Sequence, residues 1–593
     1  MPSPATGRIA DSDAVRGIAA AEAALWANGF DASKLADYQA AHRKLEEQIA
    51  AGGADRRHKF VVVIPVADRP QHIATCLDSL LALCRAYGYG GTRDGRWHKI
   101  VAVIADDSAD ATCIASNRAL AERMTRLGLV TRHFGPDEQA TLLESLDETE
   151  RASLQSSIGD TAPVYRGHKG QGVMRNLAYL HLARLRRAEP DERLLFWSLD
   201  SDQEFSVKVG TPKGDVETCA ISFFHRLDEI FDQTDALLLT GKVVGDPPVS
   251  PAVMTGNFLA DVIGFLDLTA RGDPRAACRH HDHHDQSAHR QGEATYHDMA
   301  ERFGYRKADE TYRYPCPLAD RHTEADGFAH FASRLNGFFH GEHPTRVSRY
   351  VHDDLWRTVQ PARTVYAGNY VFRPEGLKYA IPFAALRLRM SGPTLGRLAK
   401  SRIGPRFVSA NLPMLHKRTV EGTSQSEFRP GIAGGAASAA GEARIDMCGE
   451  FERQFFGDVM LFSIERLTAD GFPMRVIAPA DQLRTLEAVR DELLQQYNAR
   501  RADILAKVGR LRERLDDPAA WWSAAAHTAA TANFRNFIDN IARNFADDSL
   551  CRERINSAEN WRRWRGDLAA AIQRYPDDAQ AWSAAIERYA RRP

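Results

Sequence analysis

The residues best suited to chemistry in this chain are two aspartates, Asp200 and Asp202, which follow the apolar run 194–199 with one residue between them. On an extended backbone alternate side chains share a face, so both carboxylates can point at one ion. Mg²⁺ and Mn²⁺ prefer oxygen ligands and commonly keep coordination positions for substrate phosphates. An Asp-x-Asp turn after a buried strand therefore predicts a binding site for a metal ion and a diphosphate. A solvated turn is the alternative for the tripeptide alone.

A second segment suited to an anionic ligand spans residues 166–177, where glycines give way to a helix predicted over 173–187. Backbone N–H groups at a helix start carry partial positive charge, and Lys169 and Arg175 add side-chain charge beside them. The segment therefore favours a phosphate-bearing ligand. The alternative is an ordinary glycine-containing loop before a surface helix.

Strands alternate with helices through the first half of the chain. The runs 59–66 and 99–105 are typical of strands buried on both faces of a parallel sheet, and helices are predicted over 71–87 and 111–127. This order indicates right-handed βαβ units. Because ligands of such sheets bind beyond the carboxyl ends of the strands, three polar clusters are expected on one rim. They are Pro65-Val66-Ala67-Asp68, Asp106-Asp107-Ser108 and Asp200-Ser201-Asp202.

These pieces, in this order and at this spacing, resemble the nucleotide-diphospho-sugar glycosyltransferases with the GT-A fold, particularly the family-2-like group. The match covers roughly residues 58–260 and resumes at 365–373 and 411–418. The resemblance implies an α/β fold with a Rossmann-like, three-layer GT-A domain and a hexosyltransferase-like activity. It also implies Mn²⁺ or Mg²⁺ as cofactor, a UDP- or GDP-linked sugar as donor, and a small-molecule or carrier-linked acceptor.

The resemblance assigns roles to the residues after the first two strands. Pro65, Ala67 and Asp68 would border the base and the ribose of the nucleotide. Asp107, or its neighbour Asp106, would contact the nucleoside.

The resemblance also assigns the phosphate end of the site. Gly170 and Arg175 would line the nucleotide pocket, and Asp200 would approach the ribose or the metal. Asp202 and the late His416 would hold the metal ion, which acts as a Lewis acid on the leaving diphosphate. Asp200 and Asp202 are thus the expected catalytic residues.

One departure from the family concerns the general base. Inverting members usually carry an acidic pair before a late helix, but the corresponding stretch 388–397 contains no carboxylate. Either the base comes from elsewhere, or the enzyme retains configuration with help from the leaving phosphate, or the chain is a weakened catalyst. Arg389 and Arg397 within this stretch could instead bind phosphate. Candidate replacements for the base are Asp353, Asp354 and Glu375.

At 593 residues the chain is expected to form two or three domains. The C-terminal tryptophans predict a helical bundle packed on the catalytic domain, and a lipid-contacting surface is the competing interpretation. The predicted organisation is a helical segment 1–57, a glycosyltransferase domain 58–420 with an insertion at about 266–359, a flexible loop or linker 421–445 that could act as a lid, and a helical region 446–593.

The insertion contains two clusters of possible ligands. The stretch 278–285 is rich in His and begins with Cys278. Such density can bind zinc, but paired ligands at a repeated spacing are missing, so a solvated polar loop is favoured and an acceptor pocket stays open. The stretch 338–346 mixes aromatics, His and Arg, which could hold a sugar or could anchor a loop.

Composition limits the classes of function. The 77 basic and 78 acidic residues give a net charge of −1, which does not favour nucleic-acid binding. Eight scattered cysteines without a Cys-x-x-Cys pair indicate reduced thiols. With no signal peptide and no apolar run near the ~18–20 residues of a membrane span, we expect a cytoplasmic protein, and peripheral membrane contact stays open.

Two other functions remain open. A nucleotidyltransferase shares the sheet and the diphosphate-plus-metal site, but such enzymes usually carry glycines where residues 66–70 have none. A non-catalytic sugar-nucleotide-binding protein would explain the missing acidic pair.

Overall fold

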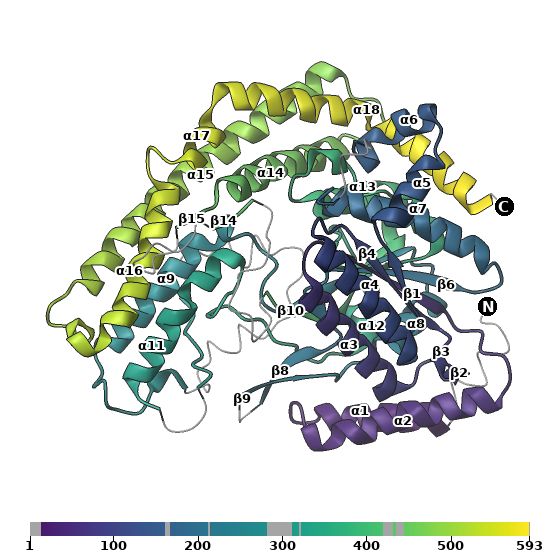
Figure 1. Cartoon of the computed structure of the whole chain (residues 1–593), viewed down its shortest axis with the longest axis horizontal. Coiled ribbons are helices and arrows are strands. Elements are labelled where there is room, and N and C mark those ends of the chain that lie inside the picture. Colours follow the sequence, from purple (N-terminus) through teal and green to yellow (C-terminus); the bar gives the residue numbers. More distant parts are fainter. Residues whose placement is uncertain are drawn as a thin grey trace.

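The computed structural model describes residues 13–160, 167–211, 214–281, 311–318, 322–418, 431–434 and 444–591. Most of the loop or linker predicted over 421–445 and residues 282–285 of the His-rich stretch lie outside this set. The molecule has a β-sheet side, at the right in Figure 1, and a helical side at the left. Long helices pass over the top and join the two.

The sheet side is built on one mixed sheet of nine strands. The first four strands of the chain in this sheet run parallel, whereas β12 is antiparallel to both of its neighbours. In order across the sheet the strands are β11 (Gln360–Pro361), β13 (Phe407–His416), β10 (Leu238–Gly245), β12 (Asn369–Phe372), β6 (Leu194–Leu199), β1 (Lys59–Val66), β4 (Ile100–Asp106) and β5 (Thr131–Phe134), with β7 (Gln203–Glu204) paired to β13.

Three two-stranded ribbons accompany the sheet in the described part of the chain. They are β2 (Thr92–Arg93) with β3 (Arg96–Trp97), β8 (Val207–Thr211) with β9 (Gly214–Thr218), and β14 (Ala433–Gly434) with β15 (Ile445–Asp446).

Helices cover both faces of the sheet because successive residues of a strand point to opposite faces. On β1, Val62 and Ile64 belong to one core, whereas Val61 and Val63 belong to the other. The first core is closed by α1 (Asp13–Trp26), α2 (Ala32–Ala51), α3 (Pro70–Tyr87), α4 (Ala111–Arg126) and α8 (Phe223–Gln233). The second is closed by α5 (Pro136–Glu144), α6 (Glu148–Ile158), α7 (Gln171–Ala188), α13 (Ser391–Ile403) and the end of α18 (Ala558–Arg591).

The helical side has one hydrophobic core of its own, to which the insertion and the C-terminal region both contribute. Phe258 stacks on Phe338 of the insertion (ring centroids 4.6 Å apart) and contacts Phe537 of the C-terminal region edge-on (5.5 Å). The prediction of an α/β chain with a helical C-terminal region is confirmed. The helices of this side are α9 (Pro251–Thr269), α11 (Glu324–Arg334), α14 (Cys448–Ala469), α15 (Pro479–Leu515), α16 (Thr528–Phe545), α17 (Leu550–Asn556) and the start of α18.

One helix of this core, α9, is long and apolar enough to cross a membrane by length and composition alone, contrary to the expectation from sequence. Its apolar window is 78% buried inside the molecule, and buried core helices of soluble proteins pass the same test. The helix is apolar all round because it is surrounded by protein.

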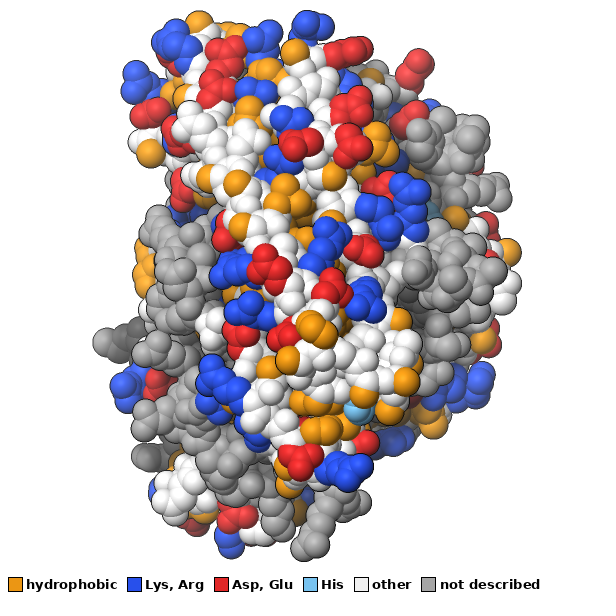
Figure 2. All heavy atoms as spheres, turned by 90° about the vertical axis from the view of Figure 1, so that its left-hand side faces the viewer, with side chains coloured by type: hydrophobic (Ala, Val, Ile, Leu, Met, Phe, Trp, Pro, Cys, Tyr) orange, Lys and Arg blue, Asp and Glu red, His pale blue; other side chains and the backbone are white. Residues whose placement is uncertain are grey.

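The C-terminal tryptophans lie inward. Trp522 is 1% exposed and stacks on Phe328, and Trp564 stacks on Phe456 (ring centroids 5.4 and 5.2 Å apart). Figure 2 views the molecule from the helical side, and the described part of that face mixes both charge signs with scattered hydrophobic side chains. A membrane-surface helix would instead present a basic face beside an apolar one. Packing within a bundle therefore accounts for these indoles.

The helix α18 connects the two sides. Leu568 and Ile572 near its start belong to the helical core, whereas Trp582 and Tyr589 near its end belong to the second core of the sheet. The Trp582 indole N–H donates to the carbonyl of Leu377 (2.8 Å). The last helix of the chain thus completes the layer beside α7, as Figure 1 shows.

The second polar stretch of the insertion, 338–346, is anchored in this core. Phe338 and Phe339 are fully buried, so their rings offer no face to a sugar. Arg346 makes two contacts with Asp261 of α9 (Nε–Oδ2 2.8 Å and Nη2–Oδ1 2.9 Å), and Thr345 donates to the same carboxylate (2.7 Å). Anchoring the loop, rather than sugar binding, accounts for these residues.

Candidate functional site

The predicted rim exists because the strands end in register. Val66 of β1 is opposite Asp106 of β4, and Val63 is opposite Ser198 of β6, so Asp68, Asp107 and Asp200 follow at the same edge. From β1 the chain adds β4 and β5 on one side of the sheet and then crosses back to add β6 on the other side. The connections therefore change direction between β1 and β6. Ligands of open α/β sheets bind outside the carboxyl ends at such a switch point.

Asp107 holds the loop that precedes α7. Its Oδ1 accepts from the backbone N–H of Lys169 (3.0 Å), its Oδ2 from that of Gly170 (3.1 Å), and its carbonyl from that of His168 (2.8 Å). Burial raises the pKa of Asp107, and the nearby Lys169 partly opposes that rise. The carboxylate therefore fixes the start of α7 at the rim.

Gly167 begins this loop and is required there. Its φ is +94°, and a Cβ would lie 2.6 Å from the carbonyl oxygen of Ser108. The glycine allows the loop to lie against the end of β4, so the N-terminus of α7 faces the switch point.

Asp68 fastens the neighbouring loop. Its Oδ1 accepts from the backbone N–H groups of Ala109 and Asp110 (both 3.0 Å), and its Oδ2 contacts Nε2 of His168 (2.5 Å). Its own φ is +50°, an uncommon conformation held by these contacts. Of the other two residues expected near the nucleotide base, Pro65 is buried within β1 and Ala67 is half-buried just after it.

Asp106 points into the domain. Its Oδ2 accepts from Asn117 (3.0 Å) and contacts Nε2 of His133 (2.9 Å), while its Oδ1 accepts from the backbone N–H of Ser108 (3.0 Å). Burial would raise the pKa of Asp106, but these partners outweigh it and lower the pKa. Both oxygens are used, so Asp106 shapes the loop, and Asp107 is the neighbour that lies at the rim.

Asp200 lies against α7. Its Oδ1 accepts from Nη2 of Arg175 (2.5 Å) and from the side chain of Gln171. Arg175 is 1% exposed and also donates to Ser198 (3.2 Å). At Gly368 a Cβ would lie 2.4 Å from Oδ2 of Asp200, so the loop before β12 packs directly on this carboxylate. Asp200 is therefore held in place by an ion pair with Arg175.

Asp202 lies beyond a turn and faces another direction. Ser201 and Asp202 form the turn, so the extended geometry expected for the tripeptide is wrong. The chain then enters β7, whose Gln203 pairs with His416 at the end of β13. This pairing carries Asp202 across the edge of the sheet to His416, although β6 and β13 are not neighbours.

The two side chains present unpaired acceptors to each other. His416 Nδ1 donates to the carbonyl of Asp246 (2.5 Å), so Nε2 is the nitrogen that faces Asp202. That Nε2 lies 3.6 Å from Oδ1 of Asp202, and neither atom has a hydrogen-bond partner among the residues that the structure describes. Both residues are nearly fully buried. A backbone carbonyl that orients the far nitrogen of a histidine is a recurrent feature of metal-binding histidines.

Two arginines share the other oxygen of Asp202. Arg418 Nη1 lies 2.8 Å and Arg69 Nη1 3.4 Å from Oδ2. Burial alone would raise the pKa of Asp202, but the neighbouring His416 together with the charges of Arg418 and Arg69 outweighs it and holds that pKa well below its usual range. Asp202 is therefore a carboxylate, beside guanidinium groups of the kind that bind phosphates.

The donor set fits a hard divalent ion in part. Asp202 Oδ1 and His416 Nε2 are two orphaned, buried acceptors facing each other, and Mg²⁺ sites often use one or two protein ligands plus phosphate and water. Asp200 does not join them. Among the described residues, the groups of three possible metal ligands whose ligand atoms lie within 4.8 Å of one another do not include Asp200, Asp202 and His416. The structure thus brings together Asp202 and His416, and it places Asp200 with Arg175.

The stretch 388–397 has no acid, and its arginines are used within the protein. Arg389 pairs with Glu450 of α14 (2.7 Å), and Arg397 pairs with Glu465 (3.0 Å). Both guanidinium groups are therefore engaged in ion pairs within the protein rather than directed at a phosphate. The candidate bases lie apart from the rim contacts: Asp354 caps the short helix α12 (Leu355–Thr358), Asp353 pairs with Arg357, and Glu375 pairs with Arg186.

Helix α14 instead brings Asp458 close to this stretch. A Cβ on the adjacent Gly457 would lie 2.5 Å from the carbonyl of Arg389. Burial raises the pKa of Asp458 to about 7, although Gln454 donates to it (2.9 Å).

This shift predicts a pH-dependent stability. A carboxyl group with a raised pKa in the folded state binds its proton more tightly there, so the free energy of unfolding falls as pH rises from about 4 to about 7. Asp458→Asn removes the charge, and we expect it to be more stable than the wild type by about 2 kcal/mol at pH 8 and equal at pH 4. Urea unfolding at both pH values measures this. Asp491→Asn, on an exposed side chain, should show no such difference, and an equal effect of both variants would contradict the expectation.

Sequence reasoning missed several site residues. Arg69 directly follows Asp68, and Arg418 lies two residues after His416. Both arginines are therefore next to predicted site residues, but the sequence pattern gave them no role. Gln171 and Tyr366 were also missed; the Tyr366 hydroxyl accepts from Gln203 (3.0 Å), and burial together with the nearby charges of Asp200 and Asp202 raises its pKa. Only the folding of separate loops onto one rim identifies these residues.

Comparisons with known proteins add little. No protein-family profile matches this chain, and no curated protein matches it. Among solved structures, the chain matches the crystal structure of S. aureus TarS 1–349 with 13% identity over 90% of this chain and 91% of that one. The TM-score is 0.25, which is too low to show a shared fold.

Proposed function

We propose that this protein is a metal-dependent glycosyltransferase of the GT-A type that transfers a sugar from a nucleotide-diphospho-sugar to an acceptor. The observation that carries the proposal is the buried pair of unpartnered acceptors, Asp202 Oδ1 and His416 Nε2, at the rim that the start of α7 also reaches. A sheet with helices on both faces and a ligand site at its switch point is consistent with the GT-A type.

In this proposal the protein residues position the donor. The N-terminus of α7 binds phosphate through its first backbone N–H groups, and Asp107 keeps the preceding loop in place by accepting the N–H groups of Lys169 and Gly170. Arg69 and Arg418 bind phosphate oxygens when the donor arrives. Asp200, fixed by Arg175, borders the ribose.

Asp202 and His416 would hold Mn²⁺ or Mg²⁺. The ion would stabilise negative charge on the departing diphosphate as a Lewis acid. Because Asp246 fixes the tautomer of His416, Nε2 is available as a ligand without rearrangement.

A thermal-shift panel tests the proposal. A ligand that binds only the folded state raises the melting temperature, and a concentration 100 times Kd stabilises by about 2.7 kcal/mol. We expect UDP, GDP or their sugar conjugates to raise it in the presence of Mn²⁺, and we expect EDTA to remove most of the shift. Equal shifts with and without EDTA, or none across the panel, would contradict the proposal.

Product analysis separates the alternatives. Incubation with the sugar nucleotide that binds best should release a nucleoside diphosphate. Pyrophosphate chemistry would support a nucleotidyltransferase. Metal-dependent binding without any turnover would support a binding protein, which the absence of an acid in 388–397 favours.

A further inference from the structure

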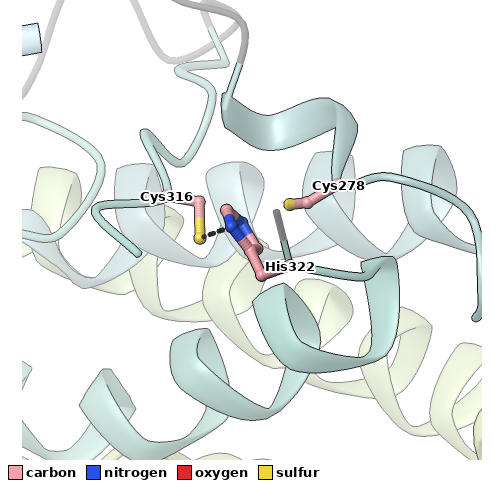
Figure 3. Close-up of side chains that lie close together, drawn as sticks. All are labelled: Cys278, Cys316 and His322. Atoms are coloured by element: carbon pink, nitrogen blue, oxygen red, sulfur yellow. Dashed lines mark hydrogen bonds between the residues drawn. The ribbon is translucent and has the colours of Figure 1, made fainter. Parts of the chain in front are cut away.

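Three metal-ligand side chains meet in the insertion, away from the rim. The sulfurs of Cys278 and Cys316 and a ring nitrogen of His322 all lie within 4.8 Å of one another. Cys316 Sγ is 3.3 Å from His322 Nε2, and the Cys278 thiol is hydrogen-bonded to Cys316. Figure 3 shows the three side chains converging from three separate segments.

The backbone holds these segments in place. The N–H of Cys278 donates to the carbonyl of His322 (3.1 Å), and the N–H of Cys316 donates to the carbonyl of His280 (3.1 Å). On α11, a Cβ at Gly327 would lie 2.7 Å from the Cys278 sulfur, so the glycine leaves room for that sulfur. The cluster is therefore preorganised by the fold.

We propose that Cys278, Cys316 and His322 bind a zinc ion. Zinc is bound in proteins by thiolate sulfur and imidazole nitrogen, and a structural site has four such ligands, of which these side chains supply three. With Zn–S and Zn–N bonds of about 2.3 and 2.0 Å, a sulfur and a nitrogen ligand in tetrahedral geometry are separated by about 3.5 Å. The observed 3.3 Å between Cys316 Sγ and His322 Nε2 is close to that value. The fourth position is left for water or a further ligand.

The ion would be structural. Cys278 follows α9, and His322 directly precedes α11, both of which contribute to the helical core. Zinc would thus fasten the segment that follows α9 to the segment that precedes α11 and to the segment containing Cys316. His280, from the same His-rich stretch, does not join these three ligands, because it is buried and its Nε2 is hydrogen-bonded to Thr269 (3.0 Å).

The test measures zinc in the full-length protein, purified under a phosphine reductant and passed over a chelating resin. We expect one zinc per chain in the wild type and in Cys84→Ser, a buried cysteine far from the cluster. We expect little or none in Cys316→Ser and His322→Ala. Asp202→Asn should retain zinc, which separates this site from the one in the proposed function.

Several results would overturn the proposal. These are a wild type without zinc, a Cys278–Cys316 disulfide, or loss of zinc in Cys448→Ser but not in Cys316→Ser. The last result would assign the ion to the second cluster, Asp446, Cys448 and Cys551.

A second readout does not depend on folding of the variants. Cobalt added to the chelator-treated wild type should give the intense visible bands and thiolate charge-transfer absorption of a tetrahedral sulfur site. Cys84→Ser should reproduce this spectrum. A weak octahedral cobalt spectrum in both would contradict zinc binding by these thiols.

Discussion

Replacing Asp202 by asparagine is expected to lower kcat/KM for glycosyl transfer by about 10³-fold, or ~4 kcal/mol of transition-state stabilisation. The substitution keeps the shape of the side chain but removes the charge that would bind the metal ion and pair with Arg418. Metal-dependent donor binding, measured by calorimetry with and without EDTA, should be lost in parallel.

The control for this variant is Asp235→Asn, which removes a carboxylate with a side chain that is 82% exposed. It should leave both transfer and donor binding unchanged. Because Arg418 loses its partner in Asp202→Asn, the melting temperature is measured too. A folded Asp202→Asn protein with wild-type turnover in EDTA would show that the metal site is wrongly placed.

The second large effect concerns the buried pair Arg346–Asp261. Their side chains are 1% and 0% exposed, so Arg346→Ala leaves an uncompensated charge inside the helical core. Removing one partner of a buried ion pair typically costs 3–5 kcal/mol, and we expect a loss of about 4 kcal/mol in the free energy of unfolding. Urea unfolding followed by fluorescence measures it.

The chain offers a matched control on its surface. Arg512 and Asp539 form an ion pair of similar length (2.7 Å), but both side chains are 51% exposed. Exposed pairs contribute about 0–1 kcal/mol, so Arg512→Ala should change little. Equal losses in the two arginine variants would mean that burial does not decide the cost. The double variant Arg346→Met with Asp261→Leu should recover much of the loss, because no charge is left buried.

The sequence was sufficient for the sheet and the rim. The strands β1, β4 and β6 are continuous apolar runs with polar residues directly after them, and parallel strands place those residues at one edge. The Asp107 and Gly170 contacts follow from that placement. The local pattern predicted these elements because a strand buried on both faces tolerates few polar residues.

The rest depended on contacts between distant parts of the chain. The turn at Ser201 and the pairing of Gln203 with His416 separate Asp202 from Asp200, and no spacing rule predicts such a turn. Asp106 and Asp107 are adjacent in sequence, yet only the surrounding side chains decide that Asp106 points inward. Likewise the sequence groups Cys278 with the histidines that follow it, since Cys316 and His322 are brought to it only by the folded insertion.

The path of α18 has a practical consequence for dividing this protein. A fragment that ends before α18 would lack Trp582 and Tyr589, and it would present the bare apolar flank of α7 to water. The sheet side is therefore not an independent module that can be expressed or transplanted alone, even though its sequence pattern suggests a natural cut near residue 420. A protease that nicks the linker would leave two pieces still bound together.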